Sequence, residues 1–361
     1  MSVTRFGLLI SVSYPAVAAT IGYLLFQTFH VLVTQRHSRY LRQAFSTYVS
    51  ESLVDTLIKN PDSFKMSGEK KVISVLFSDI RGFTSMSEKL SPERLVTILN
   101  RYLGPMTEIV MDEEGTLDKY IGDAIMAIYN APLNVRNHAV KAVRSAVRML
   151  KDLEVLNQEL EKEFGVRLKI GVGVHTGEAV VGNMGSIRRF DYTAIGDTVN
   201  LASRLESRTK AYGVEIIISE DTCRELKEWF LVRKLDRIRV KGKKEPVEIY
   251  QVMADVAAGQ VDGNTHRRRM PGRPDTIDAT DVAGQSELKR LADVNDIIDS
   301  YYQALELYFA GNFKEALHAF EDILNRHPDD GPSLLLANRC RQYVANPPPE
   351  GWDGVYVARS K

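Results

Sequence analysis

The sequence predicts an α+β domain with a largely antiparallel sheet over residues 70–253 of a 361-residue chain. Three observations predict this fold class. Short apolar segments typical of strands alternate with amphipathic helical segments along this region. The segments 116–121 and 124–129 are expected to be strands joined at Gly122 and Asp123, a pair of residues that favours a hairpin. In residues 168–174 apolar side chains alternate with glycines, which favours a strand that another element approaches closely.

The other elements of this domain follow from local signals. Residues 72–78 form an apolar run that is typical of a buried strand and ends at Asp79. Ser91 is a good helix cap and Pro92 a good first helical residue, so a helix is expected from there to about Glu113. A second long helix is expected over residues 136–163, and further strands near residues 178–184, 188–193, 214–218, 231–240 and 246–252.

Composition excludes several classes of protein. The hydrophobic share of 44% and the charged share of 26% are typical of globular chains and exclude a disordered one. The 47 Lys and Arg residues balance 47 Asp and Glu residues, so the chain is not a general nucleic-acid binder. Cys223 and Cys340 are too few for a disulfide framework or a Cys-rich zinc site.

The amino-terminal segment has the composition of a membrane span. Residues 6–33 contain no Asp, Glu, Lys or Arg, and this run exceeds the roughly 20 residues that cross a bilayer as a helix. A signal peptide is the alternative, but the apolar run is too long for one. Arg36, Arg39 and Arg42 follow the run, so the positive-inside rule places the rest of the chain in the cytoplasm. We therefore expect a transmembrane helix within residues 1–33, single-pass in the inner (plasma) membrane.

The segments that flank the α+β domain are expected to be helical or irregular. Residues 34–69 contain a juxtamembrane helix that ends near Asn60, either a simple connector or a dimerising signalling helix. Residues 254–284 lack periodicity and are rich in Gly, Asp, Arg and Pro, which is typical of a linker. Residues 285–345 have the spacing of a tetratricopeptide (TPR)-like helical module, which could bind a protein partner. Residues 346–361 form a tail that begins with prolines and is expected to lack regular structure.

Two acidic residues are the first candidates for chemistry. Asp79 ends an apolar strand and Asp123 occupies a hairpin tip, so both are expected at an open end of the sheet. Neighbouring strands would bring the two carboxylates together, and like charges at that distance need a counter-ion. Magnesium is typically held by one or two carboxylates together with substrate phosphates. The alternative is a pair of ordinary turn aspartates.

Three further groups are candidates for phosphate or sugar binding. The turn at residues 79–84 contains Gly82 and exposes backbone N–H groups, which is typical of a phosphate cradle. Asn200 and Arg204 are four residues apart and so share one helical face, where an amide and a guanidinium orient a sugar and a phosphoryl group. A surface hydrogen bond is the alternative for this pair. Lys241 lies in a basic loop that, by itself, is typical of a solvated turn.

Residues 77–84, 119–124 and 195–205 together resemble three motifs of the class III nucleotidyl cyclases, in the family's order. The resemblance covers about half the chain. The layout as a whole resembles membrane-anchored bacterial adenylate cyclases, in particular the carboxyl-terminal part of those with a CHASE2 sensor. It implies a ferredoxin-like catalytic domain that converts ATP into 3′,5′-cyclic AMP and pyrophosphate.

The resemblance also implies a role for each matching residue. Asp79, Asp123 and the backbone carbonyl of Ile80 would bind two divalent ions, Mg²⁺ or Mn²⁺, in each active site. The turn with Gly82, Phe83 and Thr84 would hold phosphates. The remaining matches would contact the substrate: Lys119 and Thr193 the purine, Asn200 the ribose, Arg204 the transferred phosphoryl group, and Arg188 and Lys241 the triphosphate.

The resemblance further implies a head-to-tail homodimer. One subunit would supply Asp79 and Asp123, and its twin Lys119, Thr193, Asn200, Arg204 and Lys241. The nearest alternative is a guanylate cyclase, against which Lys119 argues, because guanylate cyclases have Glu there. A non-catalytic membrane scaffold is a second alternative. A diguanylate cyclase would need a Gly-Gly-(Asp/Glu)-Glu-Phe turn, which the sequence lacks. The activating signal is not indicated by any residue pattern.

Overall fold

The computed structural model describes Val17 and residues 19–27, 68–186, 189–226, 229–239, 245–255 and 282–357. The chain divides into two units, Met1–Phe64 and Lys65–Lys361. In the first unit, Val17 and residues 19–27 are helical, and their large apolar side chains are exposed.

No helix of the described residues is both long and apolar enough to cross a membrane. The described helical residues lie inside the expected span at residues 6–33, but most of that span is outside the described part of the chain. The expected juxtamembrane helix at residues 34–60 is also outside it. The membrane anchor and the signalling helix therefore stay predictions.

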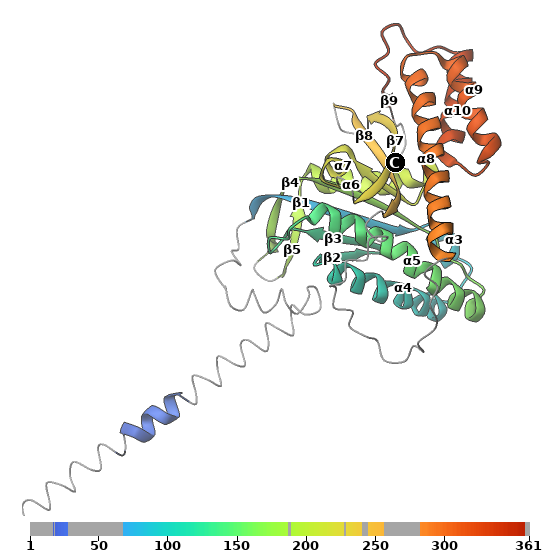
Figure 1. The fold of residues 1–361 in the computed structure, drawn as a ribbon. Coiled ribbons are helices and arrows are strands. Elements are labelled where there is room, and N and C mark those ends of the chain that lie inside the picture. The colour runs from blue at the N-terminus through green and yellow to red at the C-terminus, as the bar shows by residue number, and fades with distance from the viewer. Residues whose placement is uncertain are drawn as a thin grey trace, which may run out of the picture. The chain divides into compact units, whose positions relative to one another are not determined.

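The second unit is built on one mixed sheet, to which the described residues contribute nine strands (Figure 1). The strands are β1 (Glu69–Ile80), β2 (Thr116–Ile121), β3 (Ala124–Tyr129), β4 (Ile170–Ser186), β5 (Arg189–Ile195), β6 (Ile216–Ser219), β7 (Phe230–Arg239), β8 (Val247–Asp255) and β9 (Tyr356–Val357). Their order is β2-β3-β1-β4-β6-β8-β7-β9, and β5 pairs with β4. All pairings are antiparallel except β4 with β6 and β7 with β9. The predicted α+β class with a largely antiparallel sheet is confirmed.

Helices alternate with the strands of the second unit. They are α3 (Phe83–Ser87), α4 (Pro92–Asp112), α5 (His138–Phe164), α6 (Asp197–Tyr212), α7 (Glu220–Leu226), α8 (Val282–Phe309), α9 (Phe313–Arg326) and α10 (Gly331–Ala345). The Ser91 side chain accepts a hydrogen bond from the backbone N–H of Arg94, so the predicted cap of α4 is confirmed. Gly165, in the left-handed conformation, ends α5.

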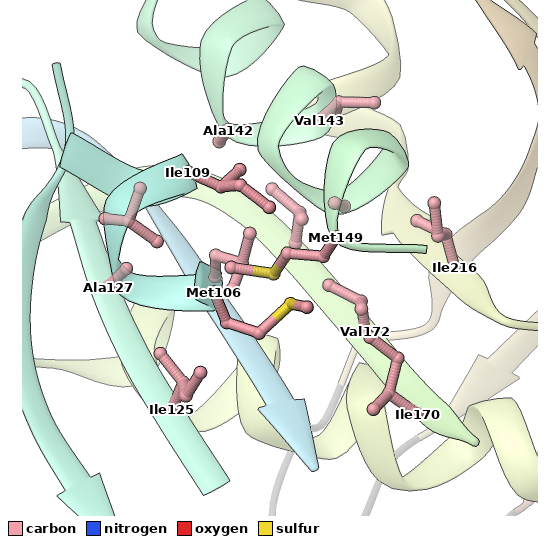
Figure 2. Close-up of a cluster of buried hydrophobic side chains, with 14 of the residues drawn as sticks. Met106, Ile109, Ile125, Ala127, Ala142, Val143, Met149, Ile170, Val172 and Ile216 are labelled. Carbon is pink, nitrogen blue, oxygen red and sulfur yellow. The ribbon is translucent and has the colours of Figure 1, made fainter. Parts of the chain in front are cut away.

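Helices α4 and α5 bury one face of the sheet. Met106 and Ile109 of α4 and Met149 of α5 pack against strand residues such as Ile125 and Val172 (Figure 2). Met106 and Met149 are fully buried, and their unbranched thioether side chains fill the centre of this cluster. This layer fixes the positions of β1 and β3, at whose neighbouring ends the candidate acids Asp79 and Asp123 lie.

Helix α6 covers the opposite face of the sheet, and two glycines let it approach closely. A Cβ atom on Gly173 would lie 2.2 Å from the backbone nitrogen of Glu206, and one on Gly171 would lie 2.2 Å from Oγ1 of Thr209. The prediction that another element packs tightly against these glycines is confirmed. Because side chains alternate along a strand, these glycines share the face of β4 that lies opposite the α4–α5 layer.

The structure differs from the sequence-based expectations at three places. The strand expected near residues 178–184 is the continuation of β4, which extends over seventeen residues. The expectation that regular structure ends at the prolines 347–349 is wrong, because Tyr356 and Val357 form β9 and pair with Ile238 and Arg239 of β7. Helix α8 begins at Val282, inside the segment that was expected to be a linker.

Candidate active site

The two predicted acids meet at one end of the sheet. Asp79 lies at the end of β1, and Asp123 lies in the turn between β2 and β3, where Gly122 has a φ of 68°. The pairing of Ser78 with Ile125 brings this turn next to the end of β1. Oδ2 of Asp123 accepts a hydrogen bond from the backbone N–H of Ile80 at 3.2 Å. Two acids that are far apart in the sequence, Asp79 and Asp123, thus form one acidic cluster.

The electrostatics of this cluster favour a bound cation. Burial and, next, the adjacent Asp79 carboxyl together raise the pKa of the Asp123 carboxyl to about 6, although the backbone N–H of Ile80 opposes them. Two carboxylates this close repel each other when both are ionised, and a divalent cation removes the repulsion. The described residues contain no group of three or more His, Cys, Asp or Glu placed to hold a metal. Two carboxylates fit a magnesium site that is completed by water and substrate phosphates.

A third acid, Glu206 on α6, borders this cluster. Burial raises the pKa of its carboxyl to about 7, and the Asp79 carboxylate is the next largest cause. Its Oε1 lies 3.2 Å from the position a Cβ would take on Gly171, the β4 partner of Asp79. Sequence analysis missed Glu206, because a glutamate in an amphipathic helix is ordinarily a surface residue.

The predicted phosphate turn follows the acidic cluster directly. Gly82 has a φ of 70° and precedes the first residue of α3, so Phe83 and Thr84 begin a helix whose first N–H groups have no intrahelical partner. The backbone N–H of Arg81 donates to the carbonyl of Lys169 at 2.8 Å, which fixes the turn to the start of β4. The structure therefore brings the predicted metal residues and the predicted phosphate turn, from Asp79 to Thr84 and Asp123, to one end of the sheet.

The two predicted purine-binding residues lie on either side of a buried acid, Asp118. Oγ1 of Thr193 donates a hydrogen bond to Oδ2 of Asp118 at 2.5 Å, and Nζ of Lys119 lies 3.3 Å from Oδ1 of Asp118. The Asp118 side chain is fully buried, while the Lys119 side chain is 40% exposed. Burial raises the pKa of the Asp118 carboxyl, and the Thr193 hydroxyl and Lys119 oppose that effect.

Asp118 takes this position because of a bulge in the sheet. The register between β2 and β3 shifts between Leu117 and Lys119, so Asp118 is the extra residue. Thr193 and Ala194 of β5 contact Asp118, although β5 pairs with β4 and not with β2. The sequence analysis missed Asp118, since a register shift is decided by the pairing of two strands and not by the sequence of one.

Asn200 and Arg204 lie away from the acidic cluster of their own chain. The residues of α6 that are buried against the sheet include Thr198, Ala202 and Leu205. Asn200 is exposed and Arg204 partly exposed, and their spacing places them together outside that buried stripe. Asp79 lies on the sheet that α6 covers, so this pair faces away from it. Arg188 and Lys241, the last two predicted site residues, lie outside the described residues.

The comparison with known families agrees with this site. Residues 66–254 match the family described as "Adenylate and Guanylate cyclase catalytic domain". The match covers more than half of the chain and includes every described site residue. The chain therefore belongs to this family of enzymes, which are lyases.

Some similar proteins are named adenylate cyclases and others guanylyl cyclases. The chain is 41% identical over 189 residues to "Adenylate cyclase" of Anabaena cylindrica, covering 50% of this chain and 37% of that protein. It is 33% identical over 278 residues to "Adenylate cyclase, terminal-differentiation specific" of Dictyostelium discoideum, covering 76% of this chain and 12% of that protein. The solved structure of the guanylyl cyclase Cya2 is 38% identical with a TM-score of 0.50, covering 53% of this chain and 95% of Cya2. The chain thus spans 37% of the length of the first of these curated relatives and 12% of the second.

Proposed function

We propose that the chain is an adenylate cyclase, which converts ATP into 3′,5′-cyclic AMP and pyrophosphate in signal transduction. The observation that carries the proposal is the meeting of the Asp79 and Asp123 carboxylates beside the Gly82 turn. Family membership supplies the reaction class, and the names of the curated relatives support ATP as the substrate.

The cluster around Asp118 supports adenine as the base. Thr193 donates its single hydroxyl proton to Asp118, which leaves the Thr193 oxygen as an acceptor. An acceptor there suits the 6-amino group of adenine and opposes the 6-oxo group of guanine. Lys119 has only donors, which suits the unprotonated N1 of adenine and opposes the protonated N1 of guanine. Asp118 thus positions both purine contacts.

In the proposed reaction the ribose 3′-oxygen forms a bond to the α-phosphorus and the bond to the β-phosphate oxygen breaks. The 3′-hydroxyl loses its proton, and pyrophosphate leaves. Divalent ions held by Asp79, Asp123 and the Ile80 carbonyl would lower the pKa of the 3′-hydroxyl and neutralise the leaving group. The Gly82 turn holds phosphate oxygens, Asn200 orients the ribose, and Arg204 donates to the charge that develops on the α-phosphoryl group.

We propose that two chains share each active site. A single chain supplies the acids on its sheet but turns Asn200 and Arg204 away from them, so a second copy must bring that pair. Val72, Val180 and Ile195 support such a contact, because they are 47%, 42% and 59% exposed on adjoining strands. A symmetric head-to-tail dimer would build two equivalent sites.

The decisive experiment measures cyclic nucleotide formation by the purified full chain with ATP or GTP, and with Mg²⁺ or Mn²⁺. We expect cyclic AMP as the main product and no turnover by the Asp79→Asn and Asp123→Asn variants. Preference for GTP would identify a guanylate cyclase, as in Cya2. No product from either nucleotide would favour a non-catalytic scaffold.

The membrane placement is a separate proposal. The uncharged run at residues 6–33, with Arg36 and Arg39 after it, supports a single-pass anchor in the plasma membrane and a cytoplasmic catalytic domain. A CHASE2-type sensor and a partner for the helical module are expectations of the same kind. Fractionation of cells that express the full chain, against a variant lacking residues 1–33, tests the anchor.

A further inference from the structure

Helices α8, α9 and α10 with β9, here called the carboxyl-terminal module, share buried charges with the catalytic domain. Arg339 of α10 forms an ion pair with Asp236 of β7, and their side chains are only 7% and 0% exposed. Tyr212, the last residue of α6, donates its hydroxyl to the same Asp236 oxygen at 2.5 Å. Arg339 also donates to the Tyr212 hydroxyl at 3.3 Å. One cluster therefore joins α10, β7 and α6.

A second buried pair lies beside the first. Arg233 of β7 donates to Asp330 at 2.8 Å, and their side chains are 1% and 8% exposed. Asp330 also caps α10 by accepting a hydrogen bond from the backbone N–H of Ser333. The Arg233 guanidinium lies 4.6 Å from the ring centre of Tyr301 in α8. The same aspartate thus sets the start of α10 and its place on β7.

The module also packs directly against α6. A Cβ on Gly331 would lie 2.3 Å from the carbonyl oxygen of Tyr212, so only glycine allows α10 to begin there. Leu335 and Tyr356 of the module pack against the apolar cluster that contains Leu201 and Leu205 of α6. These leucines flank Arg204 in the sequence. Helix α6 is therefore held between β4 on one side and the module on the other.

The energetics indicate what the buried charges do. Removing two charges from water costs several kcal/mol per ion, and their attraction offsets that cost only with good geometry. Such a pair adds little net stability compared with apolar side chains of the same size. It does restrict how the surfaces fit together, because a shift of α10 would leave Asp236 or Arg339 buried without its partner. Precise placement, rather than strong attachment, is the property that this cluster supplies.

We propose that Arg339, with Asp236 and Tyr212, is a positioning cluster by which the carboxyl-terminal module fixes α6 and so places Asn200 and Arg204 for the cyclase reaction. The inference rests on the proposed function for its catalytic consequence. It makes the module a part of the catalytic unit and not only an arm that recruits partners. None of the three residues touches the substrate.

The test compares Arg339→Met with Arg341→Met in the full chain. Arg341 lies on the same helix and pairs with Glu321 at 2.7 Å, but it is 48% exposed, so its loss should change nothing measurable. Misplacement of reacting groups by about 1 Å costs up to about 100-fold in rate. We expect Arg339→Met to lower kcat by about 10- to 100-fold with little change in the KM for ATP. Tyr212→Phe, a milder change, should act in the same direction, and Arg339→Lys should restore part of kcat.

Amide hydrogen exchange gives a readout that needs no activity. Arg339→Met should raise exchange at the carboxyl-terminal end of α6 and in β7, and leave α4 and α5 unchanged. If the wild-type chain makes no cyclic nucleotide, the proposed function fails, but exchange at α6 still decides whether the cluster positions that helix. Unchanged kcat and unchanged exchange in Arg339→Met and Tyr212→Phe would overturn the proposal. A uniform rise in exchange with a loss of folded protein would also overturn it, because it indicates a general structural role.

Discussion

Gly173→Ala tests whether the close packing of α6 on β4 sets the activity. The added Cβ would lie 2.2 Å from the Glu206 nitrogen and 2.4 Å from the Ala202 carbonyl oxygen. Both are backbone atoms, so no side-chain rotation relieves the contact, and α6 must retreat by about 1.2 Å to reach an ordinary contact of 3.4 Å. The helix that moves is the one that carries Asn200 and Arg204.

The expected cost has two parts. Overpacking of this kind typically destabilises a protein by about 1–3 kcal/mol. A misplacement of about 1 Å costs up to about 100-fold in rate, which is about 2.7 kcal/mol in the barrier. We expect kcat for cyclic AMP formation to fall by this order, with a lowered midpoint of thermal unfolding measured on the same sample.

Gly171→Ala is the matched control on the same strand and face. Its closest neighbour is Oγ1 of Thr209 at 2.2 Å, a side-chain atom, and the next is 3.2 Å away. Its cost should therefore be smaller, and Thr209→Ala in the same chain should remove most of it. If Gly173→Ala keeps kcat within twofold and unfolds at the wild-type temperature, the close packing of α6 does not control the site.

The remaining predictions concern the acids, the base and the shared site. The pKa of Asp123 in the folded protein, about 6, lies above its ordinary value of 3.8, so its carboxyl stabilises the metal-free fold below about pH 4 and loses that contribution as the pH rises through 6. Calorimetry of the protein in the presence of a chelator should detect this loss of stability, and the Asp123→Asn variant should not show it. If the wild-type protein instead becomes more stable than Asp123→Asn between pH 4 and 7, the raised pKa is contradicted. Asp118→Asn removes the buried carboxylate that Thr193 and Lys119 contact, and the loss of one such charged partner costs about 1–3 kcal/mol. The ratio of kcat/KM for ATP to kcat/KM for GTP should therefore fall about 10-fold or more. An unchanged ratio would show that Asp118 does not take part in base selection. Arg204→Ala should lower kcat by about 100- to 1,000-fold if Arg204 acts as an oxyanion donor, and a change in KM alone would exclude that role. Mixing Asp79→Ala chains with Arg204→Ala chains should restore about one site of two in mixed dimers, whereas a mixture as inactive as its components would argue against a shared site.

The sequence alone determined the local elements. The hairpin strands at residues 116–121 and 124–129 have the predicted limits, because their short apolar segments and the Gly122–Asp123 turn depend only on neighbouring residues. The cap at Ser91 was also predictable from neighbours, since it is made by a side chain and an amide three residues later. The same local information gave the positions of the site residues along the chain.

Burial decided the length of β4, where the local sequence indicated two separate strands. The sequence predicted two strands in place of β4, because the middle of this segment holds polar residues such as His175 and Thr176. In the fold these side chains are buried and bonded, Thr176 to Ser74 at 2.7 Å and His175 to Ser219 at 2.7 Å, so the strand continues. Partners 102 and 44 residues away supply those bonds, and no window of sequence contains them.

Tertiary structure alone decided which residues of the site act together. The pairing of β1 with β3 joins Asp79 to Asp123, a bulge places Asp118 under Lys119 and Thr193, and the packing of α10 joins Arg339 to Asp236. The sequence fixes the identity of each residue and the local path of the chain. The distance between charges that are far apart in the sequence depends on strand register and on helix packing, which the burial of apolar surface in the whole unit determines.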